Sequence, residues 1–307
     1  MREARKTILV TGSHRSGSTW AGKILALAPN TGYIHEPFNI DIKCGVIENP
    51  FKYWFQYVCE ENSDDYEAVL RRVIHYEYPL GNNLARVRTV RNVAKIAKDQ
   101  GLSLLHKIRN DTPIVKDPIS VFSADWLSKI YDMNVLVMIR HPAAFCSSLK
   151  IKNWKFDFNN FLNQPLLMDI YLGVFEKEIR EFAENEKDII DQAILLWNCI
   201  HHTINIYQQG HPEWLFVKHE DLSNEPVDQF QSIYETFNLE FTSKAKSIIL
   251  KSSGGHNPME QQPGNEFLRN SKANIFNWNK RLSQNEIERI REKTHEISSI
   301  FYVEHEW

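Results

Sequence analysis

The chain has 307 residues, of which 42% are hydrophobic and 24% are charged, so it has the length and apolar content for one large α/β domain or two ordinary ones. Its 36 basic residues against 39 acidic ones give a formal net charge of −3, which argues against a general nucleic-acid binder, because such proteins normally carry a basic excess. No apolar run approaches the roughly 18 residues of a membrane helix, and the four cysteines lack the spacing of a zinc site. We therefore expect a soluble cytoplasmic enzyme with no metal, no nucleic-acid partner and no membrane anchor.

Short apolar runs alternate with segments of helical spacing along the chain. The runs cover residues 7–11, 32–35, 113–116, 135–140 and 214–218. Runs of this kind that lack polar alternation and are separated by helices predict a parallel sheet covered on both faces. The expected fold is a three-layer α/β fold, similar to that of P-loop proteins, with a central parallel sheet of about five strands flanked by helices.

Three segments between these runs have a different character. Residues 51–100 and 165–209 are predicted to be helical insertions above the sheet, so residues 1–307 are expected to form one domain. Residues 252–273 are rich in Gly, Pro, Asn and Gln and have no periodicity. A structureless stretch longer than about 12–15 residues is typical of a functional lid or of a disordered segment. Basic residues near the end of this stretch favour a mobile closing loop.

The strongest local signal follows the first apolar run, where residues 11–20 read TGSHRSGSTW. A buried strand that enters a tight glycine-containing turn and then a helix directs several backbone N–H groups and the positive helix end to one point, which makes an anion site. Gly12, Gly17 and Thr19 fit the phosphate-binding template G-x-x-x-x-G-K-[ST], but Ser18 stands at the lysine position. Since that lysine pairs the β- and γ-phosphates of a nucleoside triphosphate, the substitution disfavours a kinase.

The cationic groups of the sequence lie elsewhere. One is Arg15, inside the loop, and another is Arg140, which ends the fourth apolar run where an Mg²⁺-binding Asp would be expected. An arginine at that strand end would repel Mg²⁺ and attract a second anion. The sequence therefore predicts a nucleotide with two separated anionic groups, neither of them chelated to a metal. A P-loop nucleotide kinase or NTPase, and a non-catalytic nucleotide-binding module, are the alternatives.

These motifs resemble those of the sulfotransferases that use 3′-phosphoadenosine 5′-phosphosulfate (PAPS). HRSGSTW is similar to the 5′-phosphosulfate loop of the carbohydrate and tyrosylprotein enzymes, which has the form R-S-G-[ST]-[ST]. RHPAAFCSS resembles their second signature, an arginine followed eight residues later by a serine. YIHEPFN, IVKDP and WLFVKHEDL resemble further landmarks, in the family's order. The resemblance runs from residue 7 to about residue 278 and implies a sulfotransferase of the EC 2.8.2 class that releases adenosine 3′,5′-bisphosphate (PAP).

The resemblance also implies which residues hold the donor. By this resemblance, the 5′-phosphate side of the donor is bound by the loop residues Arg15, Ser16, Gly17, Ser18 and Thr19. The 3′-phosphate is bound by Arg140, Ser148, Arg269 and Ser271. Helical geometry is compatible with the second set, because a proline at the first helical position after Arg140 places Ser148 about two turns along that helix.

Glu36 is the expected general base, because sulfuryl transfer to an alcohol needs a group that takes the hydroxyl proton. Pro37 predicts extended backbone at Glu36. His35 is the alternative base, and an ion pair with Arg15 or Lys116 is the structural alternative for the Glu36 carboxylate. Lys116, at the end of the third run, is expected to reach the oxygen that bridges phosphorus and sulfur.

The resemblance to the R-S-G-S-T branch implies an acceptor as well. It is expected to be a hydroxyl on a sugar or on another small molecule, such as a natural product. The expected reaction is a single in-line displacement at sulfur, without a metal and without a covalent enzyme intermediate. PAPS is already an activated mixed anhydride, so the protein needs only to orient it and to stabilise the charge that develops.

Overall fold

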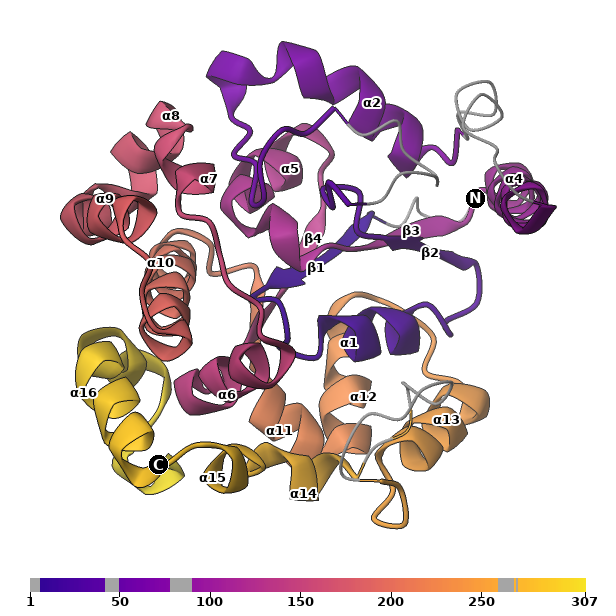
Figure 1. Cartoon of the computed structure of the whole chain (residues 1–307). Coiled ribbons are helices and arrows are strands. Elements are labelled where there is room, and N and C mark those ends of the chain that lie inside the picture. Colours follow the sequence, from indigo (N-terminus) through magenta and orange to yellow (C-terminus); the bar gives the residue numbers. More distant parts are fainter. Residues whose placement is uncertain (1–5, 42–49, 78–89, 259–267, 269) are drawn as a thin grey trace.

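The computed structural model of the chain describes residues 6–41, 50–77, 90–258, 268 and 270–307. A five-stranded, all-parallel sheet with the order β2-β3-β1-β4-β5 lies at its centre (Figure 1). The strands are β1 (Ile8–Gly12), β2 (Thr31–His35), β3 (Thr112–Lys116), β4 (Asn134–Ile139) and β5 (Leu215–Lys218). The predicted α/β class and the predicted parallel sheet are confirmed, and each strand begins and ends within a residue of its apolar run.

The sheet has a hydrophobic core on each face. Successive side chains of a strand point to opposite faces, so Leu9 of β1 joins the larger core while its neighbours Ile8 and Val10 join the smaller one. Leu9 and Val10 are both 0% exposed. This burial on both sides explains why the strand runs show no polar alternation.

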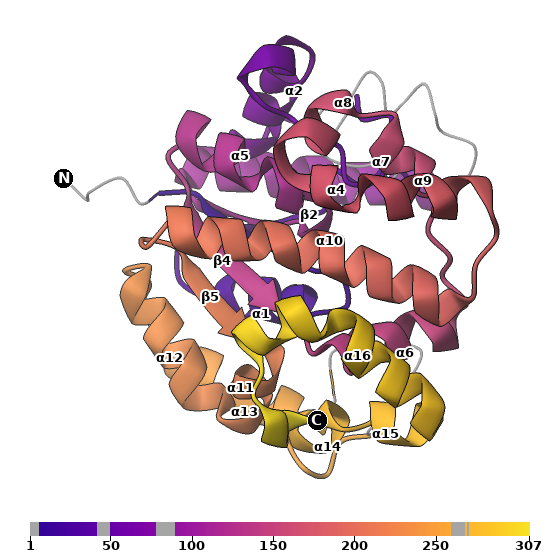
Figure 2. The ribbon, with the colours of Figure 1, turned by 90° about the vertical axis from the view of Figure 1, so that its left-hand side faces the viewer.

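Helices cover both faces of the sheet, as Figures 1 and 2 show. The smaller core takes side chains from α1 (Ser18–Leu25), α12 (Pro226–Thr236) and α13 (Ser243–Ser253). The larger core takes side chains from α5 (Ala124–Ile130), α6 (Pro142–Lys152), α10 (Ile189–Gly210) and α16 (Gln284–Phe301). The other α-helices of the described residues are α2 (Asp64–Ile74), α4 (Val90–Arg109), α7 (Asn159–Leu162), α8 (Pro165–Leu167), α9 (Glu176–Glu184), α11 (His219–Asn224), α14 (Ser271–Ile275) and α15 (Trp278–Arg281). No helix among these residues is both long enough and apolar enough to cross a membrane.

The two predicted insertions contribute to the same core as the strands. Phe55 and Leu70 of the first insertion and Trp197 of the second belong to the larger core, together with Leu9 of β1. Between residues 252 and 273, α13 ends at Ser253 and α14 begins at Ser271, while residues 259–267 and 269 lie outside the described part of the chain.

Helix α1 lies unusually close to strand β3. The contact is made at Gly22, where an added Cβ would lie 2.9 Å from Cβ of Lys116 and 3.0 Å from its Cγ. A side chain at position 22 would therefore meet the stem of Lys116. This close approach holds α1 against the end of β3.

Candidate active site

The turn between β1 and α1 borders a cavity of about 400 Å³ at the carboxyl ends of the strands. Gly17 is the N-cap of α1 and has a φ of 85°, and no side chain caps this helix end. The N–H groups of the first turn therefore have no acceptor within the helix. A Cβ at position 17 would lie 2.4 Å from Nδ1 of His219, so a glycine is needed both for the backbone conformation and for the approach of His219.

Several polar side chains around this turn are buried without a hydrogen-bond partner. They are the hydroxyls of Thr11, Ser13 and Ser16 and Nδ1 of His219. Leaving a buried polar group unpaired costs about 1–3 kcal/mol. Donors of this kind beside a free helix N-terminus fit an anionic ligand such as a phosphate group.

Glu36 and Lys116 form an ion pair at the ends of neighbouring strands. Lys116 is 0% exposed and its Nζ donates a hydrogen bond to Oε1 of Glu36, whose side chain is 18% exposed. Asn39 Nδ2 donates to Oε2 of Glu36 at 2.8 Å. Burial by itself would raise the pKa of Glu36, but Lys116 and Asn39 outweigh burial and hold this pKa below its ordinary value. The carboxylate is therefore ionised and able to accept a proton.

The backbone at Glu36 is left-handed, with a φ of 44°, so the extended geometry predicted from the following proline is wrong. Glu36 N–H donates to the Lys116 carbonyl at 2.8 Å, and the Glu36 carbonyl accepts from Asn39 N–H at 3.2 Å. Asp117 Oδ2 accepts from Phe38 N–H at 2.6 Å. These bonds outweigh the steric preference imposed by proline. Backbone strain that is held in this way is typical of functional sites.

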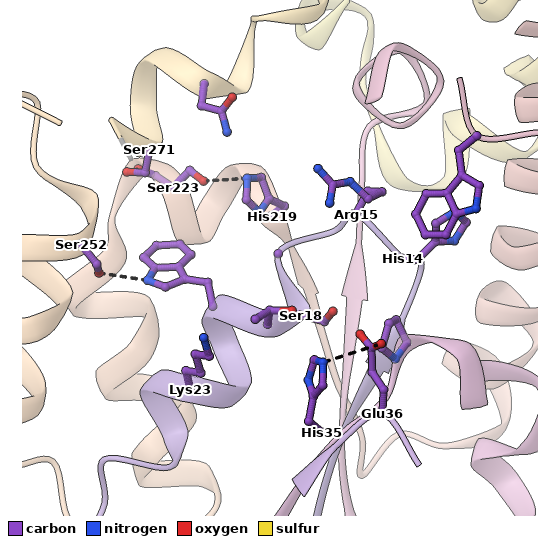
Figure 3. Close-up of a pocket in the computed structure, with 16 residues that line it drawn as sticks. His14, Arg15, Ser18, Lys23, His35, Glu36, His219, Ser223, Ser252 and Ser271 are labelled. Atoms are coloured by element: carbon purple, nitrogen blue, oxygen red, sulfur yellow. Dashed lines mark hydrogen bonds and ion pairs between the residues drawn. The ribbon is translucent and has the colours of Figure 1, made fainter. Parts of the chain in front are cut away.

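His35, the alternative base, lies beside Glu36 at the exposed end of β2 (Figure 3). Its Nε2 is 3.9 Å from Oε2 of Glu36, and its side chain is 51% exposed. Its Nδ1 is 3.2 Å from the Tyr33 hydroxyl. Both predicted bases line the same cavity.

The residues predicted for the 3′-phosphate are not all brought together. Arg15 Nε donates to Oγ of Ser148 at 2.9 Å, so Ser148 contacts the loop arginine. Arg140 is buried, and its Nε lies 3.7 Å from Oε1 of Glu220, whose Oε2 accepts from the Tyr302 hydroxyl at 3.0 Å. Neither Arg140 nor Ser148 is among the residues that line the cavity. Their contact with the donor stays a prediction, and Arg269 lies outside the described residues.

The predicted Ser271 lines the cavity, and it is linked to α11 there. Its hydroxyl donates to the Ser223 carbonyl at 2.9 Å. The Ser223 hydroxyl forms a hydrogen bond of 3.2 Å with Nε2 of His219, and nearby Trp20 Nε1 donates to Oγ of Ser252 at 3.1 Å (Figure 3). Apart from Arg140, Ser148 and Arg269, the predicted loop and donor residues lie at or beside this cavity.

Other lining residues were not predicted from the sequence. His219 follows the fifth strand directly, and ligands of parallel α/β sheets bind at that end of the strands, so its position was a usable signal. Ser223 lies one turn further along α11. Ser252 begins the segment 252–273 that was predicted to be a closing loop, although it was not itself predicted as a site residue. Lys23 and Asn274 had no comparable signal, because only tertiary packing brings them to the cavity.

A glycine-containing turn at the carboxyl end of the central strand of a parallel sheet, with polar groups turned toward one cavity, is the arrangement by which α/β proteins receive phosphorylated ligands. The described residues contain no group of three or more His, Cys, Asp or Glu side chains arranged to hold a metal ion. Beside the turn lies the ion pair of a carboxylate, Glu36, and a lysine, Lys116.

Residues 7–243 match the family model described as the sulfotransferase family, and the chain belongs to this family. It is a sulfotransferase, an enzyme that moves a sulfuryl group. A search of curated protein sequences found no match. The match of residues 7–243 to the family model confirms the predicted family and enzyme class.

Solved structures of sulfotransferases are similar to this chain at low identity. The sulfotransferase domain of the Synechococcus PCC 7002 olefin synthase is 12% identical, with 99% of this chain and 97% of that chain covered and a TM-score of 0.47. The sulfotransferase domain of the curacin biosynthetic pathway is 13% identical, with 95% and 98% covered and a TM-score of 0.46. Mouse sulfotransferase SULT7A1, in complex with PAP, is 10% identical, with 96% and 85% covered and a TM-score of 0.47.

Proposed function

We propose that this sulfotransferase uses PAPS as its donor and a hydroxyl of a small molecule as its acceptor, with PAP as the second product. The observation that carries the proposal is the meeting of three groups in one cavity: an uncapped helix N-terminus, Arg15 in the loop before it, and the ionised Glu36. The helix N-terminus and Arg15 would stabilise an anionic leaving group, and the Glu36 carboxylate would accept the proton of the acceptor hydroxyl.

The donor would extend along the length of this cavity. Its 5′-phosphosulfate would lie on the turn, against Arg15 and the N–H groups of residues 16–19. The opposite end, where Ser271 and His219 lie, would take the nucleoside. The Nε of Arg140 lies 3.7 Å from Glu220, so the 3′-phosphate would share the guanidinium group with that carboxylate or replace it.

The transfer is a single displacement at sulfur. The acceptor oxygen forms a bond to sulfur while the bond from sulfur to the bridging oxygen breaks, and its electron pair leaves with the 5′-phosphate of PAP. The acceptor proton passes to Glu36. Lys116 would neutralise the bridging oxygen. If its ammonium group moves from Glu36 to that oxygen, the loss of the neighbouring positive charge raises the proton affinity of Glu36 as the proton arrives.

Calorimetric titration tests the donor. We expect PAP to bind and ATP–Mg²⁺ to bind weakly or not at all, because Ser18 stands where a kinase has its phosphate-binding lysine. Tight binding of ATP–Mg²⁺ together with no binding of PAP would show a P-loop kinase or NTPase. Binding of PAP without any transfer from labelled PAPS would show a nucleotide-binding module that lacks chemistry.

The acceptor proposed from the sequence is a sugar or another small hydroxyl compound. This proposal rests on the likeness of the loop to the R-S-G-S-T branch. A screen of sugars, phenols and peptides with labelled PAPS tests it, and activity confined to peptides would contradict it.

A further inference from the structure

A second cavity adjoins the active site and shares two walls with it. Its volume is about 180 Å³, and His14 and Trp154 line both cavities. Much of its remaining wall is aromatic, with side chains from Trp54, Phe55 and Phe156. In Figure 3, Arg15 lies between His219 and His14, and His14 is on the side of Glu36. Because His14 lines both cavities, the second cavity adjoins the end of the proposed donor site where Glu36 lies.

Two polar residues of the second cavity, Asn160 and Lys155, are engaged by protein partners. Asn160 Oδ1 accepts from Trp54 N–H at 2.9 Å, and its Nδ2 donates to the Asp157 carbonyl at 2.8 Å. Lys155 forms an ion pair with Glu186. The Asp157 carboxylate also lines the cavity, and its Oδ1 accepts from Asn159. A sugar carries more hydroxyls than these groups can pair, and burying an unpaired hydroxyl is costly. A planar apolar ring would instead pack on aromatic faces.

The size of the cavity suits one ring. A cavity of about 150 Å³ with apolar walls is known to hold a benzene molecule. Trp154, at the boundary between the two cavities, packs edge-on to Trp54 with 6.1 Å between ring centroids. It is still 40% exposed, so part of its aromatic surface is accessible to a ligand. The second cavity is therefore large enough for a single aromatic ring.

His14 is the polar group at this boundary. It is 8% exposed, its ring contacts Phe145 at 4.9 Å and Trp154 at 5.2 Å between centroids, and its Nδ1 is buried without a hydrogen-bond partner. Burial, assisted by the charge of Arg15, lowers the pKa of His14 to about 3. The imidazole is neutral, so one ring nitrogen donates and the other accepts.

We infer that the second cavity binds an aromatic ring of the acceptor, and that Trp154 and His14 select a phenol or an aryl alcohol over a sugar. This inference rests on the proposed function and narrows its acceptor class. The ring enters the second cavity and its hydroxyl points to Glu36 across the boundary. Transfer to a phenol then yields an aryl sulfate and PAP, and the phenolic proton passes to Glu36.

The unmodified protein provides the first test. Transfer from labelled PAPS is measured with 4-methylphenol, 2-phenylethanol and methyl glucopyranoside, and PAP binding is measured separately by calorimetry. We expect kcat/KM for one of the aryl acceptors to exceed that for the glucoside at least tenfold, since packing a ring against aromatic side chains is worth a factor of about that size. If PAP binds and neither aryl acceptor is preferred, the inference is wrong while the proposed donor stands; if PAP does not bind, the proposed function itself fails.

Variants test the two boundary residues. Trp154→Leu should raise KM for the preferred aryl acceptor about tenfold and leave the Kd of PAP within about twofold. Ile151→Ala is the matched control, because Ile151 is 54% exposed, lies three residues away and does not line the cavity.

His14→Phe keeps an aromatic ring but removes both nitrogens, and should lower kcat/KM for the aryl acceptor with PAP binding retained. His14→Asn should recover part of that loss; equal losses with the glucoside and the aryl acceptor would overturn the selective role.

Discussion

Lys116 and Glu36 are joined by a hydrogen bond that follows from the register of the sheet. Strand β2 pairs with β3 so that His35 lies opposite Lys116, and Glu36 comes one residue beyond. The left-handed backbone at Glu36 then turns its carboxylate back onto Nζ of the buried lysine. The fold itself thus holds a base and a cation together, and the cation keeps the base ionised.

Glu36→Gln tests the base. We expect kcat to fall by about 10²–10⁴-fold while the Kd of PAP changes little, because a positioned general base contributes a factor of that size. Glu184→Gln, on the exposed end of α9, is the control for the loss of one carboxylate. Full activity of Glu36→Gln combined with an inactive His35→Ala would assign the base to the histidine.

The pH dependence of the reaction distinguishes the two bases in another way. Because the pKa of Glu36 is lowered, kcat/KM should hold down to a pH below the ordinary glutamate value of about 4.3. If Lys116 moves to the donor, the acidic limb of kcat should lie at higher pH than that of kcat/KM. An acidic limb of kcat/KM well above the ordinary glutamate value would count against Glu36 and favour the histidine.

The lowered pKa of Glu36 also affects the free energy of unfolding of the protein. A carboxylate whose pKa is lower in the folded chain contributes stability that is present above its unfolded pKa and is lost as the pH falls through its folded pKa. The free energy of unfolding of Glu36→Gln should therefore differ most from the unmodified protein near neutral pH. Denaturant titrations at pH 7 and pH 3 measure this, and a difference that grows toward pH 3 would contradict it.

Gly17→Ala tests the anion-binding turn. We expect it to weaken PAP binding at least tenfold and to destabilise the fold by about 1–2 kcal/mol, because an alanine disfavours the positive φ and its Cβ would meet His219. Gly101→Ala is the matched control: it lies in α4 with open space around it and should be neutral or stabilising by up to about 1 kcal/mol. Equal effects of the two variants would show that the turn has no special role.

Arg140 combines a structural and a proposed binding role, which a pair of variants separates. Arg140→Ala removes the cationic partner of the buried Glu220, which keeps only its hydrogen bonds from Tyr302 and His141, and should cost about 3–5 kcal/mol of stability. Adding Glu220→Gln should recover part of this loss. In the double variant, PAP should bind about 10- to 100-fold more weakly while AMP, which has no 3′-phosphate, is nearly unaffected. Equal weakening of both ligands would remove Arg140 from the 3′-phosphate site.

The sequence was sufficient to predict the sheet and the placement of the main chemical groups along it. Each strand is an uninterrupted apolar run because both of its faces are buried, and the carboxyl ends of parallel strands meet at one edge. Arg15, Glu36 and Lys116 each follow or end such a run, so their approach to one another follows from the topology.

The contacts of single side chains could not be predicted in the same way. Arg15 bonds Ser148 across 133 positions, and Arg140 pairs with Glu220, a residue to which the motifs gave no role. The second cavity is built from residues near positions 14, 54 and 154, which become neighbours only through tertiary packing. Spacing within one helix predicted that Ser148 lies about two turns beyond the start of α6, but it did not show that the serine would bond Arg15.

The close contact between Gly22 and Lys116 implies that the activity of this enzyme can be adjusted from outside its cavity. Position 22 lies on the inner side of α1, and any larger residue there would press on the stem of the lysine, whose ammonium group holds the base. The two positions are therefore expected to vary together among descendants of this chain. In a laboratory evolution experiment, changes at position 22 should alter turnover more than donor affinity.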